Sequence, residues 1–325
     1  MENEKVIGLD AQETAIFLPF KELTDTLRAA FVEGCEMPVR HHHTVDVTDE
    51  AAATLLLMPA WHCAHRSSRY LGIKIVTVFP GNAGRNLPGL TSTYMLYDAQ
   101  TGIQLATLEG NVITGRRTVA ASALAADYLA RRDARRLLVL GAGRVASLIP
   151  DAYRAVRPLD HVAVWDIDGG NAERLAQSIA ASGLAASIVD DLEKAVAETD
   201  IISAATLATT PIIKGEWLRP GTHVDLIGGF TPGMREADDD AILRASVFID
   251  TDEALHEAGD LVQPINTGLF SEKNVRSTLA GLCRENRFAR GSDTEITLYK
   301  AVGTALADLA AATMVYEAAV SNAEG

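Results

Sequence analysis

The sequence predicts an α/β protein with a parallel sheet wrapped by helices and a second, β-rich part. Three observations predict this fold class. Between residues 137 and 250, short apolar runs typical of buried strands alternate with helical segments. A glycine-rich turn joins the first of these strands to the helix that follows it. Before residue 116, strand patterns instead follow one another through short connections, which indicates antiparallel pairing.

The glycine-rich turn lies in the context that a dinucleotide-binding motif requires. An apolar strand over 137–140 leads into the sequence GAGRVA at 141–146, which opens a helix. A second apolar run over 161–165 ends at Asp166, twenty residues after the turn. This order of strand, glycine turn, helix, strand and acid is the fingerprint of a Rossmann domain.

Each residue type in this motif has a physical reason. Gly141 permits the tight turn, Gly143 leaves room for a pyrophosphate, and Ala146 lets the helix pack close to the strand. The helix N-terminus then presents free N–H groups to the phosphates. Asp166 is placed to accept hydrogen bonds from the ribose and would repel a 2′-phosphate. The motif therefore predicts NAD as cofactor, with NADH preferred over NADPH; a purely structural glycine turn is the alternative.

Pro150 departs from the pattern because it lies inside the helix that follows the turn. Proline in a helix interior costs about 3 kcal/mol relative to alanine. We therefore expect this helix to be kinked or shortened.

The β-rich part precedes the nucleotide motif. Its predicted elements are a helix over 20–32, an extended segment over 37–43, and strands over 53–58, 71–79, 91–97 and 103–108. The sequence DAQTG between the last two strands is typical of a hairpin. A long alanine-rich helix over 118–131 then leads into the parallel sheet.

The rest of the chain alternates between strands and helices, which implies a parallel sheet covered on both faces. After the motif we predict helices over 171–181 and 191–198 and strands over 185–189, 201–205, 224–227 and 247–250. The last predicted element is an alanine-rich helix over 296–319, expected to return and pack on the first part. The expected domains are thus 1–116, completed by 303–325, and a Rossmann domain over 117–302.

Composition narrows the class of protein further. The chain has 325 residues, 48% of them hydrophobic, which suffices for two domains with a substantial core. No apolar run reaches the ~18 residues that span a bilayer. Three widely spaced cysteines indicate neither a disulfide framework nor a zinc site, so we expect a cytoplasmic protein. A net charge of -14 argues against nucleic acid or anionic membrane as a partner.

In so acidic a chain, isolated cations in structured segments are informative. Lys74 interrupts the apolar strand over 71–79, and a lysine there is rarely buried without a partner. Arg117 or its neighbour Arg116 begins the helix that enters the cofactor domain, and Arg40 lies in the extended segment. Each alone is more often a solvated charge or half of a structural ion pair. Together they predict an anion site, since arginine binds carboxylates bidentately.

The histidines do not predict a metal. His41, His42 and His43 are consecutive in an extended segment, where neighbouring side chains point to opposite faces and cannot converge on one ion. We therefore expect no metal site.

Five segments together make the chain similar to the ornithine cyclodeaminase/mu-crystallin family, over nearly its whole length. They are LGIKIVTVFPGN (71–82), TGRRTVA (114–120), GAG (141–143), GGFTPGMRE (228–236) and TLYKAVG (297–303). The resemblance implies a homodimer whose β-rich part serves for dimerisation and substrate binding and whose last helix rejoins that part. Members include cyclodeaminases, alanine dehydrogenases, ketimine or pyrroline-2-carboxylate reductases and a thyroid-hormone-binding crystallin.

The resemblance also assigns roles to residues. It implies that Arg40, Lys74 and Arg117 hold the substrate carboxylate, in agreement with the charge argument. The residues expected to bind the cofactor are Gly141, Ala142, Gly143, Arg144, Val145, Asp166 and Gly228. The resemblance implies that cyclodeaminases carry an aspartate at the position of Phe230, next to the substrate amine. Phenylalanine can neither accept a proton nor stabilise an ammonium as a carboxylate does. The segment is more similar to the reductase branch.

The resemblance therefore implies an NAD(P)H-dependent imine reductase that converts a small α-imino acid to an L-amino acid. The substrate is either cyclic, of the pyrroline-2-carboxylate type, or open-chain, of the iminosuccinate type. Lys74 is the expected catalytic residue, as a proton relay, while Arg116 or His43 could recognise a second carboxylate. The alternatives are an alanine dehydrogenase-like enzyme, an ornithine cyclodeaminase, and a non-catalytic protein that holds NAD(P)H and a ligand.

Overall fold

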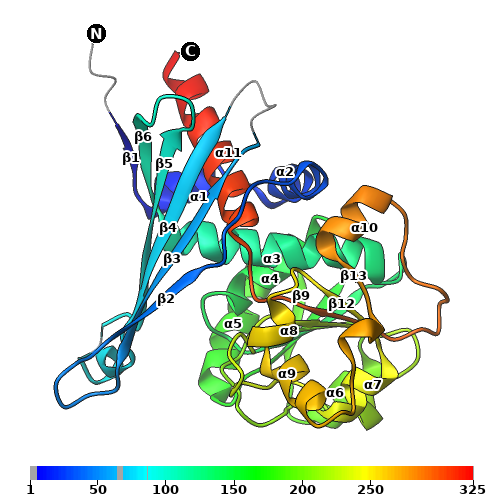
Figure 1. Cartoon of the computed structure of the whole chain (residues 1–325). Coiled ribbons are helices and arrows are strands. Elements are labelled where there is room, and N and C mark those ends of the chain that lie inside the picture. Colours follow the sequence, from blue (N-terminus) through cyan, green and yellow to red (C-terminus); the bar gives the residue numbers. More distant parts are fainter. Residues whose placement is uncertain (1–5, 64–68, 86, 325) are drawn as a thin grey trace. The chain divides into compact units, whose positions relative to one another are not determined.

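The computed structural model describes residues 6–63, 69–85 and 87–324. The chain divides into two compact units (Figure 1). The first unit combines Met1–Arg117 with Thr304–Gly325, and the second comprises Thr118–Gly303. The expected α/β class, with a β-rich part completed by the last helix, is confirmed.

The first unit is built on a six-stranded sheet in the order β1-β6-β5-β4-β3-β2. Its strands are β1 (Ile7–Leu9), β2 (His41–Val45), β3 (Ala53–Trp61), β4 (Tyr70–Val78), β5 (Leu90–Asp98) and β6 (Gln104–Glu109). Strands β2 to β6 pair antiparallel, as the short connections predict, and β1 joins β6 in parallel. No helix in the described part of the chain is both long and apolar enough to cross a membrane.

Helices cover one face of this sheet. They are α1 (Ala11–Ile16), α2 (Phe20–Glu33) and α11 (Ala305–Glu324). The unit also holds the short 3-10 helix η1 (Pro80–Arg85), between β4 and β5, and the start of α3 (Gly110–Leu129). Helix α11 packs against β3, β4 and β5 and against α2 (Figure 1). On β4, Gly72, Lys74 and Val76 are buried while the intervening Ile73 and Ile75 are half-buried. This alternation places Lys74 on the face under α11.

The second unit is an eight-stranded parallel sheet in the order β13-β12-β14-β11-β10-β7-β8-β9. Its strands are β7 (Arg136–Leu140), β8 (His161–Trp165), β9 (Ala185–Ile188), β10 (Ile201–Ala204), β11 (His223–Leu226), β12 (Ser246–Ile249), β13 (Val275–Thr278) and β14 (Thr297–Lys300). The order reverses at β7, where a doubly wound sheet forms its ligand crevice beyond the carboxyl ends of the strands.

Helices alternate with these strands. They are α4 (Ile149–Arg154), α5 (Gly169–Ala181), α6 (Leu192–Glu198), α7 (Asp239–Arg244), α8 (Ala254–Glu257), α9 (Gly259–Asn266), α10 (Leu279–Glu285) and the 3-10 turns η2 (Ala146–Leu148), η3 (Gly215–Trp217) and η4 (Glu272–Asn274). Aspartate side chains cap α5, α6 and α7, each accepting a backbone N–H of the first turn.

The starts of two helices differ most from those expected. The predicted helix over 296–319 was wrong at its start, because Thr297–Lys300 forms β14, buried between β11 and β12. Its β-branched and aromatic residues favour a strand, and Gly303, with a φ of +84°, separates it from α11. The helix expected at 118 begins at Gly110, where the Glu109 carboxylate accepts the N–H of Val112.

The proline in the nucleotide motif shortens its helix, as predicted. A 3-10 turn, η2, is followed by the six-residue α4, and Pro150 lies in the first turn of α4. At that position the missing N–H has no intrahelical partner to lose.

Candidate functional site

Three charged side chains meet in the interior of the first unit: Lys74 from β4, Arg117 from α3 and Asp308 from α11. The Lys74 Nζ lies 2.7 Å from Asp308 Oδ2, and Arg117 Nε donates to Asp308 Oδ1 at 2.6 Å. Their side chains are 3%, 5% and 0% exposed, respectively. Two cations therefore share one carboxylate in a nearly dry environment, which leaves one excess positive charge.

Burial and neighbouring charges perturb this cluster. Burial lowers the pKa of Lys74 to about 8, against the raising effect of Asp308 and with further lowering by Arg117 and Arg40. For Asp308, burial acts to raise the pKa, but the charges of Arg117 and Lys74 outweigh it and the pKa is lowered. Lys74 can therefore exchange a proton close to neutral pH, while Asp308 stays ionised.

The structure separates the predicted cations into two groups. Arg117 and Lys74 meet at Asp308, and Arg40 lies near enough for its charge to lower the pKa of Lys74. Arg116 points elsewhere, because its Nε donates to the carbonyl of Leu18 at 2.8 Å and its guanidinium lies 4.2 Å from the centroid of the Phe20 ring.

Sequence reasoning missed one residue of this cluster, Asp308, and a neighbour of the cluster, Tyr94. Tyr94 pairs directly with Lys74 across β4 and β5, and it is fully buried. Its ring occupies the space over Gly72, where a Cβ would lie 2.1 Å from the tyrosine oxygen. Among the described residues, the Tyr94 hydroxyl has no hydrogen-bond partner. A lone acid in the apolar sequence ALADLAAA was the available signal for Asp308.

The glycine turn of the second unit has the geometry that a dinucleotide requires. Gly141 has a φ of +96°, and a Cβ there would lie 2.8 Å from the carbonyl oxygen of Ala205. A Cβ at Gly143 would meet no described protein atom within 4 Å, so the space above the turn is open to a ligand. Gly143 and Arg144 are exposed, whereas Ala142 and Val145 are half-buried. These residues fit a pyrophosphate approached by the backbone.

Asp166 follows β8 and contacts the glycine turn directly. Its Oδ2 accepts the N–H of Ala142 at 2.7 Å, and its Oδ1 accepts the N–H of Asp168 at 2.8 Å. The carboxylate thus lies at the carboxyl end of the strand next to β7, where the motif expects the ribose-binding acid. It also holds the turn in shape, a contact that the sequence pattern did not indicate.

Gly228 has a structural reason for being glycine. It is buried, and a Cβ there would lie 2.0 Å from the carbonyl oxygen of Thr206. Its N–H donates to Glu236 Oε2 at 2.7 Å, while Glu236 Oε1 accepts both the N–H and the hydroxyl of Thr206 at 2.8 Å. Glu236 therefore ties together the segments that follow β10 and β11. Phe230, two residues further on, is 45% exposed.

A second group of buried charges supports Glu236. Asp260 Oδ1 accepts the N–H groups of Glu236 and Ala237, and its Oδ2 lies 3.2 Å from Lys300 Nζ. Burial raises the pKa of Glu236 to about 7, although the charge of Lys300 acts to lower it. The neutral, protonated form of Glu236 is thus populated around pH 7.

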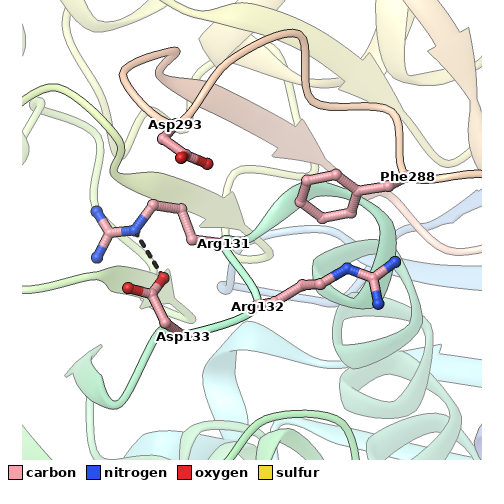
Figure 2. Close-up of a pocket in the computed structure, with 5 residues that line it drawn as sticks. All are labelled: Arg131, Arg132, Asp133, Phe288 and Asp293. Carbon is pink, nitrogen blue, oxygen red and sulfur yellow. Dashed lines mark hydrogen bonds and ion pairs between the residues drawn. The ribbon is translucent and has the colours of Figure 1, made fainter.

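A cavity of about 490 Å³ opens elsewhere on the second unit. Figure 2 shows its lining residues: Arg131, Arg132, Asp133, Phe288 and Asp293. None of them belongs to the predicted site. Arg131 is paired with Asp133 at 3.1 Å and with Asp200 at 2.7 Å, and the Arg132 guanidinium lies 5.3 Å from the centroid of the Phe288 ring. The cavity is lined by two arginines and two aspartates, so its charges are balanced within the protein.

The parallel sheet, the open glycine turn and the acid after β8 define a Rossmann-type dinucleotide-binding protein, and the first unit holds a separate buried cluster of Lys74, Arg117 and Asp308. More narrowly, the chain belongs to the ornithine cyclodeaminase/mu-crystallin family, whose model matches residues 6–323.

Similar proteins cover almost the whole chain. A Delta(1)-pyrroline-2-carboxylate reductase from Colwellia psychrerythraea is 36% identical over 317 residues, 95% of this chain and 98% of the relative. The structure of Thermococcus litoralis Delta(1)-pyrroline-2-carboxylate reductase in complex with NADH and L-proline superposes with a TM-score of 0.90 at 30% identity, covering 98% of both chains. An archaeal alanine dehydrogenase dimer with bound NAD has a TM-score of 0.88 at 28% identity, over 98% of this chain and 97% of its own.

Proposed function

We propose that this protein is an NADH-dependent reductase of a small cyclic α-imino acid of the pyrroline-2-carboxylate type. The observation that carries the proposal is the buried cluster of Lys74, Arg117 and Asp308, whose excess charge is matched by one substrate carboxylate. Two relatives that resemble the chain over nearly its full length are reductases of this imine.

The residues of the cluster have distinct tasks in such a reaction. The two terminal nitrogens of Arg117 and the Lys74 ammonium bind the substrate carboxylate. This contact holds the adjacent C=N carbon in place. NADH, when bound, supplies the hydride to that carbon. The imine nitrogen requires a proton, and Lys74 is suited to hold and pass one because its pKa is lowered to about 8. Arg40 adds positive charge to the same neighbourhood.

The positions of the other candidate cations favour a monocarboxylate over iminosuccinate. A second carboxylate would need a cation in addition to Lys74, Arg117 and Arg40, which are expected to hold the first one. Arg116 is engaged by Leu18 and Phe20 instead, and His43 is exposed on the edge strand β2. A cyclic imine with a single carboxylate therefore fits the arrangement better.

Three alternatives have less support. Phe230 places no carboxylate where a cyclodeaminase is expected to need one. An alanine dehydrogenase-like activity is favoured by one structural relative and differs from our proposal in substrate size. A non-catalytic NAD(P)H-binding protein would not need a lysine with a pKa near neutrality.

We infer that NADH is preferred to NADPH. The Asp166 carboxylate lies beside the glycine turn, where its charge repels a 2′-phosphate and its oxygens can accept from ribose hydroxyls. The remaining expected cofactor-binding residues, Gly141 to Val145, line the turn itself.

We also propose a homodimer and a cytoplasmic location. The sheet face opposite Lys74 carries half-buried apolar residues, among them Leu57, Ile73 and Met95, a surface that suits a second copy of this chain. Cys35, Cys63 and Cys283 form no disulfide, which agrees with a reducing compartment.

The test is the oxidation of NADH, followed by its absorbance, with pyrroline-2-carboxylate, piperideine-2-carboxylate, pyruvate plus ammonia, and oxaloacetate plus ammonia. Ornithine plus NAD serves as the counter-test. We expect turnover with the cyclic imines. Turnover only with oxaloacetate and ammonia would favour iminosuccinate, proline release from ornithine would favour a cyclodeaminase, and no turnover would favour the binding protein.

A further inference from the structure

The carboxylate of Asp308 divides its two oxygens between two cations. Oδ1 accepts from Arg117 Nε at 2.6 Å, and Oδ2 lies 2.7 Å from Lys74 Nζ. We propose that Asp308 is a positioning residue, which orients Arg117 and Lys74 so that both present donors to one substrate carboxylate. This inference rests on the proposed function, because it concerns the site where the imine would bind.

Asp308 contacts the Nε of Arg117, and this contact orients the guanidinium. A guanidinium is planar and offers its two terminal nitrogens as a fork for a carboxylate. Within the described part of the chain, Asp308 takes the Nε hydrogen, which fixes the plane of the group and leaves the fork for a ligand. A carboxylate that bound the fork itself would block the substrate, so the Nε contact is the arrangement that a binding site requires.

The charge balance separates this role from that of an ordinary structural ion pair. A buried lysine or arginine is usually matched by its own carboxylate, because an uncompensated charge in the interior is expensive. Here Lys74 and Arg117 share a single carboxylate, that of Asp308. All three side chains are at most 5% exposed. The groups that face Lys74 are Asp308, Arg117, Arg40 and, across β5, Tyr94, so cations prevail. A bound carboxylate supplies the missing negative charge.

The experiment compares Asp308→Asn, Asp308→Glu and the control Glu317→Gln with the wild type. Glu317 is an exposed acid of the same helix, which accepts from the Tyr70 hydroxyl, away from the cluster. KM and kcat are measured with pyrroline-2-carboxylate at saturating NADH. We expect Asp308→Asn to raise KM about tenfold or more, because a charge-assisted contact that holds Arg117 is lost. Glu317→Gln should leave KM unchanged.

The sign of the KM change is diagnostic. If Asp308 only neutralised charge, removing it would make the site more positive and lower KM for an anionic substrate, when KM is measured at a pH below the alkaline limb of kcat, where Lys74 stays protonated. A lower or unchanged KM in Asp308→Asn therefore overturns the proposal. Asp308→Glu keeps the charge but displaces the oxygens by one methylene, so positioning requires a raised KM here too. If Asp308→Asn does not fold, Asp308→Glu alone tests the proposal. A KM of Asp308→Glu equal to that of the wild type then overturns it.

The pH profile adds a readout that a merely structural role would not move. Asp308 raises the pKa of Lys74, so its removal should shift the alkaline limb of kcat downward from about pH 8, while Asp308→Glu should leave that limb in place. A loss of thermal stability with KM and pH profile unchanged would mark Asp308 as structural and overturn the proposal.

A binding measurement separates this inference from the proposed function. Calorimetric titration with L-proline and with pyruvate reports carboxylate binding without turnover. If the wild type binds these carboxylates but reduces no imine, the proposed function fails, and weaker binding by Asp308→Asn still supports positioning. If the wild type reduces the imine and Asp308→Asn matches Glu317→Gln, only the inference on Asp308 fails. If the wild type neither binds nor reduces, both fail.

Discussion

Glu236 makes the stability of the second unit depend on pH in a direction opposite to that of most carboxylates. Its pKa is raised from 4.5 to about 7 by burial. The folded protein therefore keeps this proton up to about pH 7, whereas the unfolded chain releases it near pH 4.5. Stability contributed by the proton is present below pH 4.5 and is lost as the pH rises to 7. At 1.36 kcal/mol per pKa unit, the loss is about 3 kcal/mol.

The variant Glu236→Gln removes the titration and tests this magnitude. Its amide nitrogen would face the N–H of Gly228, which lowers the free energy of unfolding by about 1–3 kcal/mol at every pH. The diagnostic quantity is therefore the slope and not the offset. About 3 kcal/mol corresponds to a change of roughly 6–12 °C in Tm for a unit of this size.

Differential scanning calorimetry between pH 4.5 and 7.5 is the assay. Other groups titrate in both proteins, so the difference in Tm between wild type and Glu236→Gln isolates residue 236. We expect the wild type to lose its advantage steadily as the pH rises. The exposed acid variant Glu216→Gln should follow the wild type at every pH. If the difference in Tm between wild type and Glu236→Gln stays constant from pH 4.5 to 7.5, the reasoning is refuted.

Three further predictions concern the cofactor, the substrate and the assembly. Arg117→Ala should lower kcat/KM for the imine by about 10- to 150-fold with the affinity for NADH intact, measured by steady-state kinetics and NADH fluorescence; unchanged kinetics would remove Arg117 from the site. Asp166→Ser should move the ratio of kcat/KM for NADH and NADPH toward NADPH. It should also weaken NADH binding, because the hydrogen bond from the Ala142 N–H is lost. A wild type that already prefers NADPH would contradict this prediction. Ile73→Glu should convert a dimer to monomers in analytical ultracentrifugation, and a wild type that sediments as a monomer would speak against the homodimer.

The sequence was informative where a local pattern carries its own physical reason. The strand, turn and acid from 137 to 166 predict the nucleotide-binding geometry because each glycine and the acid have a role defined by spacing alone. A lysine in an apolar strand was likewise a clear sign, since a buried ammonium needs a partner. Its pairing with Asp308 brings together residues that no local pattern connects.

The remainder depended on long-range contacts. The register of β4 and β5 decides that Tyr94 lies opposite Lys74, and periodicity cannot fix register between strands. The run 297–300 has apolar spacing compatible with a helix or a buried strand, and only its place between β11 and β12 selects the strand. Arg116 and Arg117 are adjacent, and the choice between them rests on where Leu18 and Phe20 lie.

The split first unit has a consequence for biosynthesis. Arg117 and Asp308 are 191 residues apart in the chain, and the whole parallel sheet is made between them. At about 5–20 residues per second, the ribosome needs roughly 10–40 s for that interval. Throughout it, the strands β1 to β6 have been made but lack the helix that covers the face of Lys74. The part that is translated first is therefore completed last, and a nascent chain released before α11 would expose an apolar sheet to chaperones and proteases.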